Sequence, residues 1–311
     1  MSIWVDANGW PVPPMILLGC LAAEILYFRG WNVLVNGTPT QDGAEHLFAS
    51  APALQATGED LRRIWFWRSV FFFAAIFTFL LAACAPIDTL AGRFFWVHMV
   101  QHLLLLVVMA PLLVAGAPLL PCWLGLPVWF RRLVMASVHL RVRRACYGVI
   151  RWLRGPVISC SLLLVGTWVW HWPPLYDFAL TNDVIHDWCE HSTFLAVSVL
   201  FWAQVIPSPP FSPRFSYPGR MAYIGVAIVQ NVVLAVLLGF AVVPLYAPYA
   251  HQVTLPGNLS PLLDQQFGAG IMWTFGDVPF GIAISILVQR WFASQPADTL
   301  PQHAGVHVEN K

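Results

Sequence analysis

The chain has 311 residues, of which 58% are hydrophobic and 10% are charged, and its formal net charge is +1. Soluble domains carry about 25% charged residues, so this composition, with a mean hydropathy of +0.67, excludes an ordinary soluble protein. It predicts an all-α, polytopic membrane protein, for which we expect no nucleic-acid partner.

Apolar runs that can cross a bilayer as helices, which takes about 20 residues each, recur along the chain. They cover residues 12–28, 65–84, 94–116, 156–172, 186–206, 221–243 and 268–290. The sequence therefore predicts a bundle of seven transmembrane helices that forms a single membrane domain over 1–293. We expect the polar segment 294–311 to be a disordered cytoplasmic tail.

The distribution of Arg and Lys predicts the orientation of this bundle. All basic residues except Arg93 fall in the first, third and fifth loops between the runs, or at the C-terminal end. Because basic residues concentrate on the cytoplasmic side, the N-terminus is predicted outside and the C-terminus in the cytoplasm. The loop 127–154 mixes Arg with aromatic residues and predicts basic interfacial helices. These helices either dock a partner or anionic lipid or merely set the topology.

The third run, FFWVHMVQHLLLLVVMAPLLVAG, contains His98 and His102 four residues apart. Residues with this spacing share one helix face, and ionisable groups inside a membrane are costly and usually functional. The pair therefore predicts a metal or cofactor site, although hydrogen bonding between helices is the plainer alternative.

Three other runs bring polar side chains to the same, outer leaflet of the predicted bundle. His171 ends the fourth run, His186, Asp187, Glu190 and His191 begin the fifth, and Asp264, Gln265, Gln266 and Met272 lie near the start of the seventh. We predict metal ligands among His98, His102, His186, Glu190 and His191, with additional candidates in His171, Asp264, Gln265, Gln266 and Met272. The alternatives are a structural role for His171, a helix cap at Asp264 and packing by Met272.

α-Helical geometry limits how the fifth run can contribute. His186 and Glu190 share a face, whereas His191 is rotated by about 100° from Glu190 at 3.6 residues per turn. One metal centre is therefore not expected to use all three residues. Two pairs remain open, His186 with Glu190 or Glu190 with His191. Imidazole suits copper, zinc and iron, and a thioether favours Cu(I). Asp264 and Glu190 are available as hydrogen-bond acceptors behind metal-bound imidazoles.

Four blocks, HMVQHLLLLVVMAPLLVAGAP, WHWPPLYDFAL, HDWCEHSTFLAVSVLFW and DQQFGAGIMW, occur in this order. Together they resemble the seven-helix CtaG family of cytochrome c oxidase assembly factors, over roughly residues 60–290. The resemblance implies a multi-pass protein of the bacterial inner membrane that assembles a haem–copper terminal oxidase without turnover chemistry of its own. It further implies binding or delivery of copper, with oxidase subunits and a periplasmic copper chaperone as partners.

Other functions use the same residues differently. A di-iron membrane enzyme would bind iron, a haem protein would use two of the histidines as axial ligands, and a scaffold would bind no metal. A metal transporter would need polar groups through the cytoplasmic leaflet, where Glu24, Asn231 and Asp277 are the few candidates.

Overall fold

The computed structural model describes residues 14–36, 58–84, 86–137, 140–182, 184–250 and 259–295. In these ranges the regular secondary structure is helical, and the only extended pairing is one isolated bridge between Ser208 and Phe211. The prediction of an all-α fold is therefore confirmed. The predicted tail lies outside the described residues beyond position 295.

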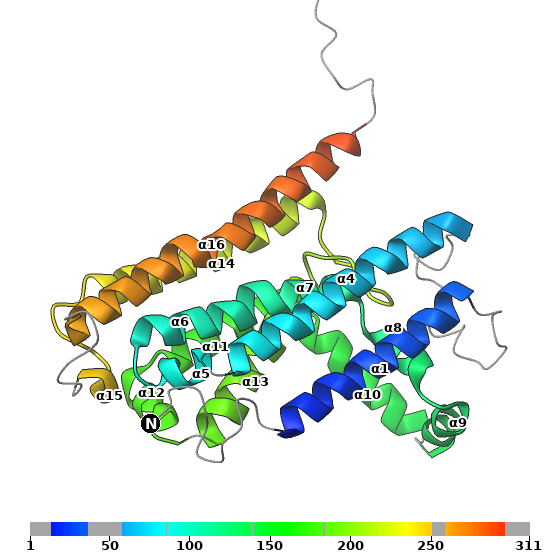
Figure 1. Ribbon diagram of the computed structural model, residues 1–311. Coiled ribbons are helices and arrows are strands. Elements are labelled where there is room, and N and C mark those ends of the chain that lie inside the picture. The colour runs from blue at the N-terminus through cyan, green and yellow to red at the C-terminus, as the bar shows by residue number, and fades with distance from the viewer. Residues whose placement is uncertain are drawn as a thin grey trace, which may run out of the picture.

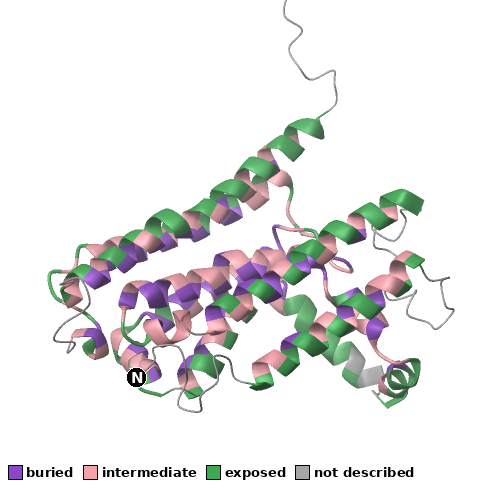
Figure 2. Cartoon of the chain, in the orientation of Figure 1, coloured by how far each residue is buried: buried purple, intermediate pink, exposed green. Residues whose placement is uncertain are grey.

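Five helical stretches are long and apolar enough to cross a membrane. They are α1 (Pro14–Asn36), α4 (Gly58–Ala83), the continuous stretch Phe95–Gly116, α14 (Tyr217–Gly239) and α16 (Pro261–Ala293). The third stretch consists of α6 (Phe95–Leu103), the π-helix η1 (Leu104–Met109) and α7 (Ala110–Gly116). Much of the outer surface of the long helices is exposed (Figure 2), and it carries large apolar side chains such as Leu18, Phe77 and Phe275. Such a surface suits a lipid environment rather than water.

Two further pairs of helices qualify only when each pair counts as one broken span. α8 (Leu119–Gly125) and α9 (Val128–Ser137) meet at 109°, and residues 144–153 of α10 (Leu140–Leu153) meet α11 (Pro156–Trp170) at 68°. The described part of the chain thus contains five to seven candidate spans. The predicted fifth span corresponds to η2 (Ile185–Glu190) with α13 (His191–Trp202), which is not among these candidates. The count of seven and the orientation of the termini stay predictions.

The ends of two predicted spans differ from the structure. α1 continues to Asn36, and α16 begins at Pro261 rather than at 268. The Ser260 hydroxyl accepts a hydrogen bond from the backbone N–H of Leu263 at 3.2 Å, and Pro261 follows it. Ser at the cap and Pro in the first turn are ordinary helix starts. Hydropathy alone missed this start because the next turn of α16 is polar.

The helices pack into two connected groups (Figure 1). α16 lies along α14 and also packs on α6, whereas α1 packs on α8 and α4. Trp202 of α13 contacts two other elements. Its indole stacks on Phe280 of α16 with ring centroids 5.2 Å apart, and its N–H donates to the carbonyl of Leu106 in η1 at 3.1 Å. These contacts hold η1, α13 and α16 together, and so fix the polar ends of these elements relative to one another. The short helices α5 (Ile87–Ala91), α12 (Pro173–Leu180) and α15 (Ala247–Ala250) lie near those ends.

Candidate metal centre

The start of α6 is fixed by a carboxylate from another helix. Asp264 of α16 is fully buried, and its two oxygens accept the backbone N–H groups of Phe95 at 2.8 Å and Trp96 at 3.3 Å. The first N–H groups of a helix have no partner within it, so Asp264 supplies the cap that α6 lacks. A helix cap was one of the expected roles of Asp264. The helix that it caps is α6, however, and not α16, to which it belongs.

The two glutamines next to Asp264 also bind backbone rather than the histidines. Gln265 accepts from the N–H of Leu245 at 2.7 Å and donates to the carbonyl of Leu238 at 2.9 Å. Gln266 donates to the carbonyl of Ala241 at 3.4 Å. The predicted additional candidates Asp264, Gln265 and Gln266 therefore lie outside the group of histidines and serve to position α16.

Replacing Asp264 by alanine should lower the thermal stability of the purified protein. The change leaves two buried N–H groups of α6 without an acceptor, and each such group costs about 1–3 kcal/mol. The midpoint of thermal unfolding in detergent is the measurement, with Gln266→Ala as a control that loses only one long hydrogen bond. Equal midpoints for the two variants would contradict the capping role.

His98 and His102 lie on one face of α6, as their spacing predicts, and their Nε2 atoms are 2.7 Å apart. The tautomer of His98 follows from its other nitrogen. Its Nδ1 lies 2.9 Å from the Tyr249 hydroxyl, which itself donates to the carbonyl of Ala91 at 2.6 Å. Tyr249 must therefore accept from His98, so the proton is on Nδ1 and the Nε2 lone pair faces His102. The Tyr176 hydroxyl lies 3.1 Å from the same Nδ1.

The start of the fifth predicted span is a π-helix, which corrects the expected geometry. In η2 the backbone N–H of His191 donates to the carbonyl of His186, five residues before it. This wider turn brings His186 and His191 together, with ring centroids 4.5 Å apart. The expectation that one centre would not use His186, Glu190 and His191 together assumed 3.6 residues per turn, which does not hold in η2. Single π-turns within α-helices are frequent at functional sites.

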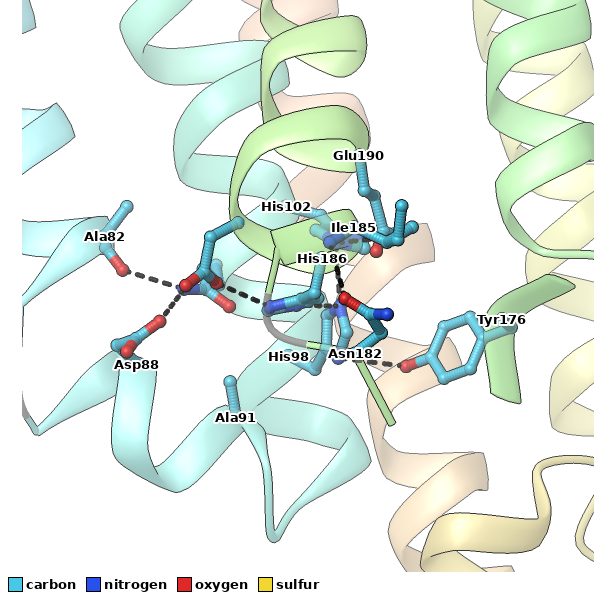
Figure 3. A network of polar contacts seen from close by, with 12 residues as sticks. Ala82, Asp88, Ala91, His98, His102, Tyr176, Asn182, Ile185, His186 and Glu190 are labelled. Carbon is cyan, nitrogen blue, oxygen red and sulfur yellow. Dashed lines mark hydrogen bonds and ion pairs between the residues drawn. The ribbon is translucent and has the colours of Figure 1, made fainter. Parts of the chain in front are cut away.

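Four histidines from three elements, α6, η2 and the start of α13, converge as a result. Each of His98, His102, His186 and His191 offers a ring nitrogen, and these four atoms all lie within 4.8 Å of one another. The first three side chains are buried, and the fourth is half-buried. We call this set the His group. Figure 3 shows the rings of His98, His102 and His186 turned toward one another, with Glu190 beside them.

Two carboxylates flank the His group. An oxygen of the buried Glu190 lies 3.4 Å from His102 Nε2, and an oxygen of Asp187 lies 2.9 Å from His186 Nδ1. Because an ionised carboxylate only accepts, His186 carries a proton on Nδ1, and its Nε2 lies 3.4 Å from His98 Nε2. The Nε2 atoms of His98, His102 and His186 thus meet in one small space. Such an arrangement needs a proton or a cation between the nitrogens.

Several buried polar atoms at this place have no hydrogen-bond partner among the described residues: His102 Nδ1, Glu190 Oε1, His191 Nε2 and His171 Nε2. Unsatisfied buried polar atoms are rare and call for an explanation such as a bound ion. Metal–imidazole bonds of about 2.0–2.1 Å in a tetrahedral site place the nitrogens roughly 3.4 Å apart. The His98–His186 distance of 3.4 Å already has this value, and the His98–His102 distance of 2.7 Å requires a small ring movement. The donor set therefore fits a metal ion.

The remaining candidates, His171 and Met272, lie beside the His group rather than in it. His171 follows the last turn of α11, and its ring centroid is 6.1 Å from that of His102. Met272 is buried on α16. Both line a cavity of about 50 Å³ that also touches His102.

Three residues that orient the histidines escaped prediction from the sequence: Asp187, Tyr176 and Tyr249. Asp187 is adjacent to His186 and is predicted only as one of several polar side chains in the outer leaflet, and Tyr176 lies in the block WHWPPLYDFAL without a ligand-like pattern. Tyr249 lies in the short helix α15, and the sequence around it shows no motif that predicts a functional site. The expected acceptor Asp264 instead binds the backbone of α6.

Substituting Asp187 by alanine should weaken metal binding without abolishing it. The Asp187 carboxylate fixes the proton of His186 on Nδ1, and loss of such a partner typically lowers metal affinity by 10–100-fold. Competition with a Cu(I) chelator measures the affinity. Asp187 is half exposed, so the variant is expected to fold normally, and an unchanged affinity would exclude the orienting role.

Comparison with protein families matches residues 48–294 to the cytochrome c oxidase caa3 assembly factor family, Caa3_CtaG. Uncharacterized proteins of Mycobacterium bovis and Mycobacterium tuberculosis are each 26% identical over 204 residues, which are 63% of this chain and 30% of theirs. An uncharacterized protein of Mycobacterium leprae is 23% identical over 229 residues, or 70% of this chain and 32% of its own. The chain thus spans about a third of the length of these relatives. No solved structure matches it.

The family match covers most of the chain and includes every residue of the His group and its flanking carboxylates. The resemblance noted in the sequence is thereby confirmed. The protein belongs to the family of cytochrome c oxidase caa3 assembly factors.

Proposed function

We propose that this protein binds copper in the His group, with Glu190 as a further ligand, and supplies it to a haem–copper oxidase during assembly. The observation that carries the proposal is the convergence of four ring nitrogens within 4.8 Å inside an apolar helical protein. Ionisable groups in a membrane are expensive to bury, so a purely structural cluster of this size would be costly. Copper is cargo here, and the protein acts without turnover chemistry.

The donor set argues against a di-iron centre of the carboxylate type. Di-iron carboxylate sites in helix bundles use a majority of Glu ligands with a minority of His. Among the described residues this site offers four imidazoles and two nearby carboxylates, Glu190 beside His102 and Asp187 beside His186. Imidazole ligands suit copper and zinc as well as iron, and we propose copper because a haem–copper oxidase needs it during assembly.

Haem is disfavoured by the size of the site. A porphyrin must fit between or beside its axial histidines, and pockets for drug-sized ligands measure roughly 300–1,000 Å³. The cavity next to His102 measures about 50 Å³. His98 Nε2 lies 2.7 Å from His102 Nε2 and 3.4 Å from His186 Nε2, so no haem fits between His98 and either of these rings.

The proposal places the protein in the bacterial inner membrane with oxidase subunits as its partners. The predicted orientation puts the His group toward the outer leaflet, where a periplasmic copper chaperone would reach it first. A buried site of this kind holds copper away from water, so that release depends on contact with a partner. Both the orientation and the chaperone belong to the proposal.

The test uses a bacterium that needs its own copy of this gene to make a haem–copper oxidase. The wild-type gene and a His98→Ala/His102→Ala/His186→Ala/His191→Ala gene are returned to the deletion strain, and the oxidase is purified from each. We expect full haem but at least tenfold less copper in the oxidase from the variant strain. Equal copper content at equal levels of the two membrane proteins would refute copper delivery and favour a scaffold.

A further inference from the structure

A second set of metal-type donors lines the cavity next to the His group. The cavity measures about 50 Å³ and lies between α6 with η1, α11, α14 and α16. Most of its lining is apolar, which is expected inside a bundle. The exceptions are two thioethers, two imidazoles and polar groups from Thr167 and α14: Met99, His102, His171, Met272, Thr167, Gln230 and Asn231.

His171 presents a free lone pair at this cavity. Its Nδ1 lies 2.8 Å from the backbone carbonyl of Thr167, and a carbonyl only accepts, so the proton is on Nδ1. The Nε2 atom has no partner, although the side chain is only 7% exposed. A buried imidazole nitrogen without a partner has lost its hydrogen bond to water and destabilises the fold, and a bound ion would give it a partner.

Two sulfur atoms are available beside it. Met99 of α6 and Met272 of α16 are 1% and 4% exposed, and both line the cavity. Methionine is flexible and usually fills gaps in a core, yet here a cavity remains between two of them. Thioether sulfur is a soft ligand that selects Cu(I).

We infer that this cavity is a second copper position, which binds Cu(I) through His171 Nε2 and the sulfurs of Met99 and Met272. The inference rests on the proposed copper-handling function and extends it. His102 stands between the two positions, because its Nε2 faces the His group and its ring also lines the cavity. Its Nδ1 is buried and has no partner.

The ligands of the two copper positions differ in chemical hardness, and this difference would let copper move from one position to the other. The His group has nitrogen donors and the carboxylate of Glu190, whereas the cavity adds sulfur. Cu(I) moves between them by exchange of ligands around His102, with no change in its oxidation state. Two adjacent positions let copper pass deeper into the bundle without meeting lipid or bulk water.

The test is an anaerobic titration of the detergent-purified full chain with Cu(I), followed by X-ray absorption at the copper edge. The variant is Met99→Leu/Met272→Leu, which nearly conserves volume. Met109→Leu is the matched control, because Met109 is a buried methionine of the same helical stretch that does not line the cavity. We expect two copper ions with a sulfur shell in the wild type and in the control. The double variant should hold one copper ion and show no sulfur shell.

The outcomes separate this inference from the proposed function. One copper ion with only nitrogen and oxygen neighbours in the wild type overturns the second position and leaves the His group intact, with water filling the cavity. No bound copper overturns both. If the double variant does not fold, the single variants Met99→Leu and Met272→Leu decide, and each should weaken binding of the second copper ion by at least tenfold. Unchanged binding in both single variants overturns the second position.

Discussion

Replacing His102 by alanine is expected to lower the Cu(I) affinity of the purified protein by about 100-fold or more. Losing a hydrogen-bond partner behind a metal ligand typically costs 10–100-fold, and His102 is expected to be a ligand itself. It is also central, because its Nε2 lies 2.7 Å from His98 Nε2 and 3.4 Å from Glu190. Competition with a Cu(I) chelator gives the affinity of both proteins.

The control for this variant is Gln266→Ala. Gln266 is a candidate ligand by sequence, but the structure places it against the carbonyl of Ala241, just after the end of α14. Its removal should leave the affinity unchanged. If instead His102→Ala keeps wild-type affinity while folding normally, His102 has only a structural role in the bundle.

Replacing Gly30 by alanine should strongly destabilise the fold. A Cβ atom at Gly30 would lie 1.8 Å from the carbonyl oxygen of Pro121 in α8, and backbone atoms cannot move aside as a flexible side chain can. Added bulk in a packed interior costs about 1–3 kcal/mol and sometimes more. The midpoint of thermal unfolding in detergent should fall by several degrees, or the variant should fail to accumulate in membranes.

Gly19 supplies the matched control in the same helix. A Cβ atom there meets nothing within 4 Å, and alanine favours helix over glycine by up to about 1 kcal/mol. Gly19→Ala should therefore be as stable as the wild type or slightly more stable. Equal loss of stability in both variants would mean that α1 does not pack closely on α8. This contact matters because α1 lies outside the region matched to the family.

The membrane class and most helices could be predicted from the sequence because hydropathy and length act locally. His98 and His102 could also be predicted as a pair, since an α-helix fixes residues four apart on one face. The same rule failed for His186 and His191, because the wider turn of η2 is set by packing and gives no distinct pattern in the sequence. The residues of the candidate site could therefore be predicted, but the way in which His186 and His191 come together could not.

The polar residues of α16 show a second limit. Asp264 and Gln265 have the composition of metal ligands, and their neighbours in sequence cannot reveal what they bind. In the fold they accept backbone N–H groups of Phe95 and Leu245, each of which would otherwise be unpaired. Tyr249 is the reverse case, because only the three-dimensional arrangement brings its hydroxyl to His98. Contacts between distant segments decided all three roles.

The measurement that tests the central claim most directly is the metal content of the detergent-purified wild-type protein after anaerobic reconstitution with Cu(I). It is read together with its optical spectrum and its copper X-ray absorption. We predict bound copper with imidazole nitrogens at about 2.0 Å from the metal and no Soret band. A protein that stays free of copper, or one that carries haem or iron in its place, would contradict the assignment of the His group to copper.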